Sequence, residues 1–215
     1  MDRRKALRNM GLAMGYTVAT PTLISLMQSC KSDPVMEWTP DFFSMEEGSV
    51  LTKLVDIILP KTDTPSASEV QVNLFIDRFI NEVGDEEQQK FTKMAMGRFM
   101  EKATKAAGKE KAGDLSSEEL EKTLASTLKI SKEEETKNME AVTTYNEAIA
   151  EGKEALLDDE VASHAFAHSL RGLTIMGYKT SEYVGEEVLA YLPVPGEYIG
   201  CGDLQELTGG KAWSL

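Results

Sequence analysis

Cysteine and histidine are scarce in this sequence, which contains two residues of each type among its 215. Two cysteines provide neither a Cys-x-x-Cys-His haem attachment motif nor a cysteine cluster for an iron–sulfur centre. The sequence also lacks a glycine-rich dinucleotide motif, a phosphate-binding Gly-Lys-Ser/Thr loop and a nucleophile elbow. Because a flavin enzyme needs a dinucleotide fold for its cofactor, we expect no cofactor in this chain and no catalysis by the chain alone.

Basic residues are also in the minority, with 23 Lys and Arg against 36 Asp and Glu and a formal net charge of −13. Four of the basic residues and one acidic residue lie among the first thirty, so residues 31–215 carry a formal charge of −16. Phosphate binding requires clusters of Lys and Arg, which argues against nucleic acid as a partner. An acidic body also gains nothing from anionic lipid head groups, so membrane contact is expected through the N-terminus alone.

The first thirty residues have the layout of an export signal, with a basic head followed by 21 uncharged residues from Asn9 to Ser29. The Arg3-Arg4 pair resembles the twin-arginine type, which exports proteins that have already folded. The uncharged run ends in the sequence LMQSC, which resembles a bacterial lipobox with Cys30 as the lipidated residue. We therefore expect a lipid-anchored protein at the periplasmic face of a bacterial membrane. Two alternatives are an uncleaved anchor helix, since about 20 residues span a bilayer, and cleavage without lipidation.

The remainder of the chain predicts a tether and one helical domain. Residues 31–43 contain two prolines and no sustained periodicity, which is typical of a tether. Residues 44–215 contain capping boxes at Ser44 and Ser131, apolar residues at helical spacing and no period-two alternation, so we predict an all-α, irregular single-domain bundle. The expected helices cover residues 44–59, 72–83, 85–107, 116–124, 131–149, 153–176 and 181–190. Beyond Gly177 the sequence is rich in Pro, Gly and Tyr, which predicts an extended C-terminal segment.

Two blocks of the sequence carry a family resemblance. The C-terminal block consists of GYKTSE at residues 177–182, LAYLPVPG at 189–196 and YIGC at 198–201. The N-terminal block consists of LTKLVDIILPKTDTP at residues 51–65 and FID at 75–77, after the twin-arginine leader. Together they resemble the gluconate 2-dehydrogenase subunit 3 family.

This resemblance implies the small subunit of an exported dehydrogenase complex. In that family a separate flavoprotein subunit, which carries FAD, oxidises a sugar or sugar acid, and a cytochrome c subunit often takes the electrons. The resemblance further implies that the small subunit supplies the export signal and stabilises the flavoprotein. It implies no catalytic residues in this chain.

Three side chains form a candidate metal site. His164 and His168 have the i, i+4 spacing that places both on one helix face, and Glu160 lies one turn earlier. Imidazole and carboxylate groups in this pattern bind transition metals, so a stand-alone helical lipoprotein that binds a metal or small ligand is the alternative function. A closed site needs a fourth ligand, however. The alternative is that these side chains form a half-buried polar stripe on the helix and bind no metal.

Three further candidate residues each have both a structural and a functional interpretation. Cys201 is either a reactive thiol or, as we favour, an inert packed side chain. Asp56 and Asp77 are either a general acid/base pair or groups that cap a helix, pair with Lys53 or Arg78, or face water.

The segment from residue 189 to 199 is the candidate partner surface. It is poor in charge and rich in Tyr and Pro, which provide large contact area at low ordering cost. The alternative is that the segment packs on its own bundle. The expected contact residues are Tyr191, Pro193, Pro195 and Tyr198.

Overall fold

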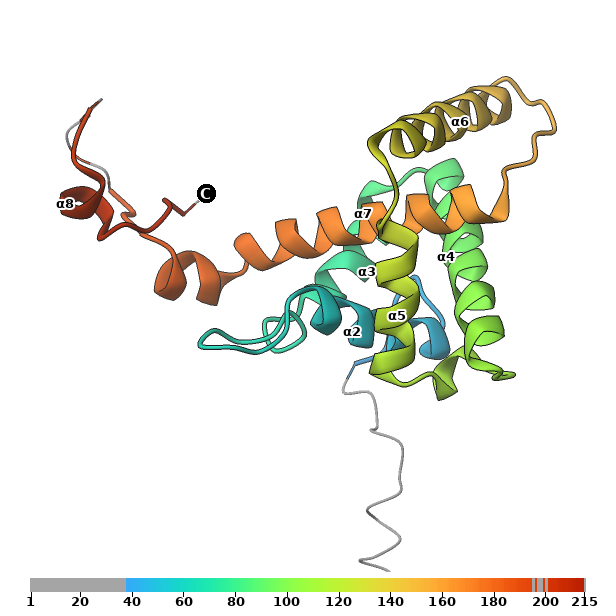
Figure 1. Ribbon diagram of the computed structural model, residues 1–215. Helices are drawn as coiled ribbons and strands as arrows, with labels where there is room; N and C mark the ends of the chain where they lie inside the picture. The colour runs from blue at the N-terminus through green and yellow to red at the C-terminus, as the bar shows by residue number, and fades with distance from the viewer. Residues whose placement is uncertain (1–37, 195, 197–198, 200, 215) are drawn as a thin grey trace, which may run out of the picture. The chain divides into compact units, whose positions relative to one another are not determined.

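The computed structural model describes residues 38–194, 196, 199 and 201–214, and within these residues the chain forms helices and no strand (Figure 1). The predicted all-α fold is confirmed. The helices are α2 (Met45–Ile58), α3 (Val72–Val83), α4 (Glu86–Ala107), the 3-10 turn η1 (Ala112–Asp114), α5 (Ser117–Leu128), α6 (Lys132–Ala150), α7 (Asp159–Lys179), the π-helix η2 (Val184–Val188) and α8 (Leu204–Thr208). None of these helices is long and apolar enough to span a membrane.

Met1–Glu37 and Trp38–Leu215 are two separate units, and the first lies outside the described residues. The predictions for Arg3, Arg4 and Cys30 fall on this first unit and stay predictions.

Capping boxes begin four of the helices. The side chains of Ser44, Asp85, Ser116 and Ser131 each accept a hydrogen bond from the backbone N–H three residues later, and the side chain at that position accepts from the capping residue. Each such cap stabilises its helix by about 1 kcal/mol. The boxes at Ser44 and Ser131 are those that the sequence predicts. Gly108 ends α4 with a φ of 65°, a conformation that glycine adopts without steric strain.

The core surrounds α7, which contacts α2, α3, α4, α5 and α6 (Figure 1). Phe166 of α7 packs against Phe99 of α4, with ring centroids 5.4 Å apart. The apolar side chains of α2, α4 and α5 that are completely or almost completely buried here are Val50, Leu51, Leu54, Val55, Ala95, Met96, Phe99, Ala103, Leu120 and Leu124. Their helical spacing is the apolar periodicity that predicts these helices from sequence.

The folded unit begins at Trp38, so it includes the last six residues of the expected tether, of which Trp38, Phe42 and Phe43 pack against the core. Asp77 of α3 is fully buried, and its carboxylate accepts the backbone N–H groups of Asp41 (2.7 Å), Phe42 (3.1 Å) and Phe43 (2.9 Å). A buried carboxylate is tolerated when several donors satisfy its oxygens. Asp77 therefore fixes the segment that leads into α2, a structural role that differs from capping a helix, because Ser44 is the cap of α2.

Two helices differ from their predictions. The helix expected from residue 153 begins at Asp159, because the Asp158 carboxylate accepts the N–H groups of Glu160 and Val161 and thereby caps the helix there. Leu156, expected on the apolar face of that helix, is fully exposed. The apolar positions of α6 are only partly covered, and α6 contains no buried residue. It lies against α7 beside an apolar groove of about 1080 Å³.

The C-terminal residues make few contacts with the helical core. The short helix expected at 181–190 is the π-helix η2. After it, Ala190 pairs with the segment before the C-terminus: its N–H donates to the Ala212 carbonyl, and its carbonyl accepts from the Ser214 N–H, both at 2.9 Å. The helix α8 has five residues, none of which is buried.

Candidate partner-binding site

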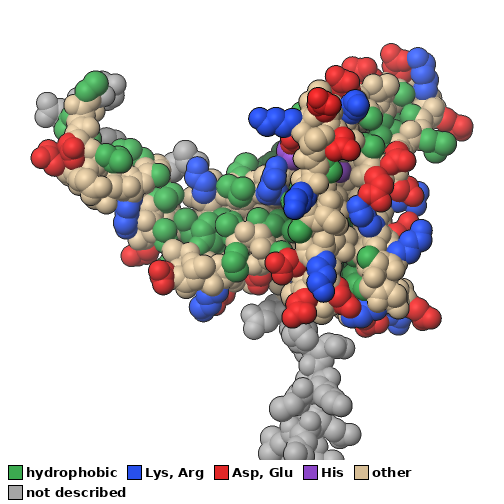
Figure 2. Space-filling model, in the orientation of Figure 1, with side chains coloured by type: hydrophobic (Ala, Val, Ile, Leu, Met, Phe, Trp, Pro, Cys, Tyr) green, Lys and Arg blue, Asp and Glu red, His purple; other side chains and the backbone are tan. Residues whose placement is uncertain are grey.

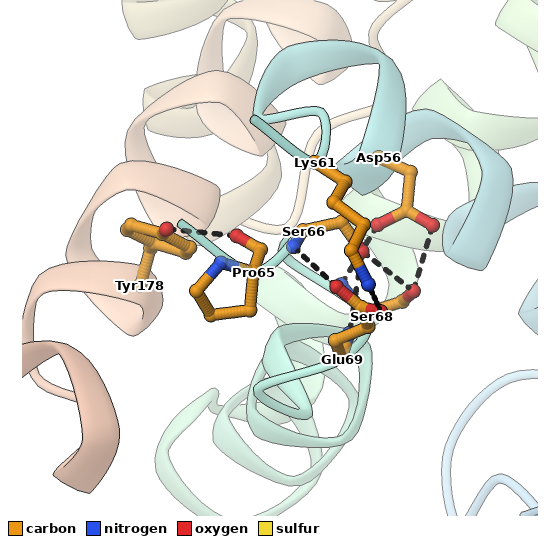
Figure 3. A network of polar contacts seen from close by, with 7 residues as sticks. All are labelled: Asp56, Lys61, Pro65, Ser66, Ser68, Glu69 and Tyr178. Atoms are coloured by element: carbon orange, nitrogen blue, oxygen red, sulfur yellow. Dashed lines mark hydrogen bonds and ion pairs between the residues drawn. The ribbon is translucent and has the colours of Figure 1, made fainter. Parts of the chain in front are cut away.

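One part of the C-terminal block, residues 177–182, lies beside the N-terminal block in the structure. The loop after α2, at residues 59–71, lies against the C-terminal end of α7. The Tyr178 hydroxyl donates to the Pro65 carbonyl at 2.8 Å (Figure 3) and lies 3.0 Å from the Thr64 hydroxyl. One side chain thus joins two segments that are 113 residues apart in the sequence.

A polar network fixes the conformation of this loop (Figure 3). Asp56 accepts hydrogen bonds from both the backbone N–H (2.8 Å) and the hydroxyl (2.7 Å) of Ser68. Glu69 accepts from the Lys61 ammonium at 2.5 Å and from the Ser66 N–H at 2.9 Å. The Lys61 hydrogen bond, followed by that from Ser66, lowers the pKa of the Glu69 carboxyl. Asp56 therefore holds the loop in place, which is a structural role and not that of an acid/base pair.

A glycine allows α7 to approach α3 closely. A Cβ atom at Gly177 would lie 2.5 Å from Cδ1 of Phe75, which is shorter than any normal contact between these atoms. Phe75 also packs against Phe79 of the same helix, with ring centroids 5.6 Å apart. The close approach lets the end of α7 and residues 180–183 form one wall of a groove whose floor is α3.

This groove has a volume of about 980 Å³. The loop supplies one side, α3 supplies the apolar side chains of the floor, and the residues after α7 supply the other side. Its lining includes apolar and acidic side chains, among them Asp63, Phe75, Phe79, Glu82, Val83, Glu182 and Tyr183. The groove is thus built from residues of both family blocks and from the helix between them.

Large apolar side chains are exposed in the C-terminal part of the chain, of which Tyr183 lines this groove. Of fourteen such exposed side chains among the described residues, ten lie beyond residue 174. They are Ile175, Met176, Tyr183, Tyr191, Leu192, Val194, Ile199, Leu204, Leu207 and Trp213. Figure 2 shows hydrophobic side chains gathered where the C-terminal half of α7 lies. Contiguous exposed apolar surface is typical of an interaction site.

The predicted contact residues fall partly within this surface. Tyr191 and Pro193 are exposed, so both side chains are accessible to a partner. Pro195 and Tyr198 lie outside the described residues.

The candidate metal ligands do not converge. The Glu160 carboxylate pairs with Lys102, while His168 Nε2 lies 3.5 Å from Glu135 Oε1. His164 is buried, and its ring centroid lies 6.0 Å from that of His168. Burial, followed by the nearby His168, lowers the pKa of the His164 imidazole. No group of three His, Cys, Asp or Glu side chains in the described part of the chain is placed to hold a metal ion.

Cys201 differs from its expected packing, because its side chain is exposed and free. It lies between η2 and α8, where no larger helix covers the chain. Lys53 and Arg78 pair with neither Asp56 nor Asp77: the Lys53 ammonium donates to the carbonyls of Gly113 and Leu115, and Arg78 lies 3.7 Å from Asp41.

Sequence reasoning missed the groove itself. The two signals that point to it are Gly177, a glycine within the last turn of α7, and the Thr-Pro pair at residues 64–65. Neither of these sequence features predicts that the two segments are neighbours in the folded chain.

Comparison with known families matches residues 45–196 to the family described as gluconate 2-dehydrogenase subunit 3. The matched range covers more than half of the 215 residues and contains the whole groove. Neither the comparison with curated proteins nor that with solved structures gives a match.

Proposed function

Because this chain belongs to the gluconate 2-dehydrogenase subunit 3 family, we propose that it is the non-catalytic small subunit of a membrane-associated, flavin-dependent gluconate or sugar dehydrogenase complex. The family is consistent with an accessory subunit of a dehydrogenase complex. In this proposal FAD belongs to the flavoprotein subunit, and a cytochrome c subunit accepts the electrons.

The single observation that carries the proposal is the exposed apolar surface beyond residue 174. Tyr183, Tyr191 and Trp213 are each about half exposed, although aromatic side chains of this size contribute strongly to stability when they are buried. Aromatic residues are enriched at the centre of protein–protein interfaces. A subunit whose main task is to hold another protein accounts for this exposure.

The proposed role in export follows from the leader. The Arg3-Arg4 pair directs the chain to the twin-arginine route, which accepts folded cargo. A flavoprotein that has already bound FAD and this subunit crosses the membrane with it. Cys30 then provides the lipid anchor at the periplasmic face.

Export of the flavoprotein is the experiment that tests this role. We expect the flavoprotein to remain in the cytoplasm when residues 1–30 are deleted or when Arg3 and Arg4 are both replaced by Lys. In either case neither the small subunit nor the flavoprotein carries a functional export signal. Flavin content and dehydrogenase activity of the periplasmic and membrane fractions measure the effect. Cys30→Ser is the matched control for anchoring: it should release the complex from the membrane after normal export. Normal export of the flavoprotein without residues 1–30 would contradict the proposal.

A further inference from the structure

We propose that the groove between residues 61–65, α3 and the end of α7 binds a segment of the flavoprotein in which a Lys or Arg side chain lies beside an apolar one. This inference rests on the proposed function. It identifies where the partner is held and which side-chain chemistry holds it.

The floor of the groove provides the apolar part of the site. Val83 is 65% exposed at the end of α3, and Phe75 and Phe79 are half-buried on the same helix. The exposed Tyr183 lies at the far wall. An apolar partner side chain on this floor would remove these four side chains from water, which is the main favourable contribution to most protein associations.

The rim of the groove is negatively charged. Asp63, Glu82 and Glu182 line it, and within the described residues none of the three has an ion-pair partner. The two basic groups of the lining are already paired, Lys61 with Glu69 and Arg78 with Asp41.

The unpaired charge of the rim is therefore acidic. Charge complementarity favours a cationic partner side chain. An Arg would pair with a carboxylate and stack on an aromatic ring, whereas a Lys would supply the charge alone. The acidic balance of residues 31–215 acts in the same direction, because it attracts a partner with a basic surface.

Contacts within the protein fix the shape of the groove. Tyr178 joins the loop to α7, Asp56 fixes Ser68, and Gly177 allows the contact with Phe75. A site that exists before the partner arrives loses little conformational entropy on binding. These three contacts distinguish the groove from the exposed segment beyond residue 190.

Charge reversal tests the cationic contact. The full chain, with the double substitution Glu82→Lys and Glu182→Lys, is co-expressed with its flavoprotein and purified through an affinity tag on the small subunit. The measured quantity is FAD retained per small subunit at low and at high salt. We expect retention at low salt to fall about tenfold and the salt dependence to weaken, because rim charges act mainly through long-range attraction.

The matched control is Glu118→Lys with Glu121→Lys on α5. These residues are exposed, have no ion pair among the described residues and lie away from the groove. The control makes the same change in net charge and should retain FAD like the wild type. Equal loss in both variants would overturn the inference, since it would reflect net charge alone.

A second pair of variants tests the apolar contact. Val83→Asp places a charge on the groove floor, and Met139→Asp places one on α6 at a similar exposed fraction, 65% against 60%. Neither residue is in the core, so both variants should unfold at the wild-type temperature. We expect Val83→Asp alone to reduce FAD retention.

The outcomes separate the two proposals. A wild-type chain that retains no flavoprotein contradicts the proposed function. A wild-type chain that retains it, with groove variants that retain it equally well, overturns only this inference.

Discussion

The helices α2 to α5 and the first half of α7 use their apolar side chains differently from the residues beyond Thr174. In the first region Leu51, Met96 and Phe99 are fully buried and belong to one hydrophobic core. In the second region Tyr191 and Trp213 are about half exposed. The same kinds of residue therefore stabilise the fold in one region and remain available in the other. The difference indicates that stability and partner binding are largely separable in this chain.

The boundary between the regions lies within α7. Thr174 is completely buried and donates its hydroxyl to the Leu170 carbonyl at 2.7 Å. Ile175 and Met176, which follow directly, are exposed. Gly177 then turns inward to contact Phe75. The last turns of α7 thus have one face on the core, at Gly177 and Tyr178, and one exposed apolar face, at Ile175 and Met176.

Removal of one large aromatic side chain from each region is the strongest test of this comparison. Phe99→Ala should lower the free energy of unfolding by about 3–5 kcal/mol, because it leaves a cavity in the core. Trp213→Ala should change it by less than about 0.5 kcal/mol, as is usual for surface substitutions. Urea denaturation followed by circular dichroism measures both. A large loss of stability in Trp213→Ala would mean that the C-terminal residues belong to the core after all.

Two glycines of α7 provide a sharper test at the boundary. Gly177→Ala should destabilise the protein by about 1–3 kcal/mol, because the new methyl group overlaps Phe75. Gly172→Ala meets no atom within 4 Å, so it should stabilise the helix by about 0.5–1 kcal/mol. Thermal unfolding of the two variants gives the sign of each effect. If both substitutions changed the stability in the same direction, the contact between α3 and α7 would not restrict the side chain at residue 177.

The smallest expected effect is a pH dependence that belongs to the core region. Burial, followed by the nearby His168, lowers the pKa of His164, so the unfolded chain binds its proton at a higher pH than the folded chain. The free energy of unfolding should therefore decrease as the pH falls from about 7 through the ordinary histidine value of about 6.5. Denaturation midpoints at several pH values measure this slope. His164→Gln should flatten it, and an unchanged slope would assign the effect to another group.

Local features of the fold are predictable from sequence because they depend on neighbouring residues. The capping boxes at Ser44 and Ser131 and the glycine end of α4 each involve residues within one or two turns. The sequence predicts a start of α7 that is too early, because Leu156 fits the helical spacing. The capping oxygen of Asp158 competes with that periodicity, and periodicity alone does not reveal that no helix covers Leu156.

The candidate site depends on contacts that local patterns do not contain. The sequence identifies one block at residues 51–65 and 75–77 and another at 177–182, 189–196 and 198–201, but it does not predict the Tyr178–Pro65 hydrogen bond that joins them. It likewise gives Asp77 several possible roles, without identifying the amides of residues 41–43 as its partners. Such pairings depend on how the helices pack. The ion pair of Glu160 with Lys102 depends on packing in the same way, because the two residues are neighbours only in three dimensions.

The hydrogen bonds of the buried Asp77 carboxylate also place a mechanical link at the start of the folded unit. A pull on Trp38 would load the chain at residues 41–43, whose amide groups this carboxylate holds. Part of that load would pass to the middle of α3 before it reached the first turn of α2. We therefore expect Asp77, together with the packing of Phe42 and Phe43, to contribute to the resistance of the folded unit to such a pull.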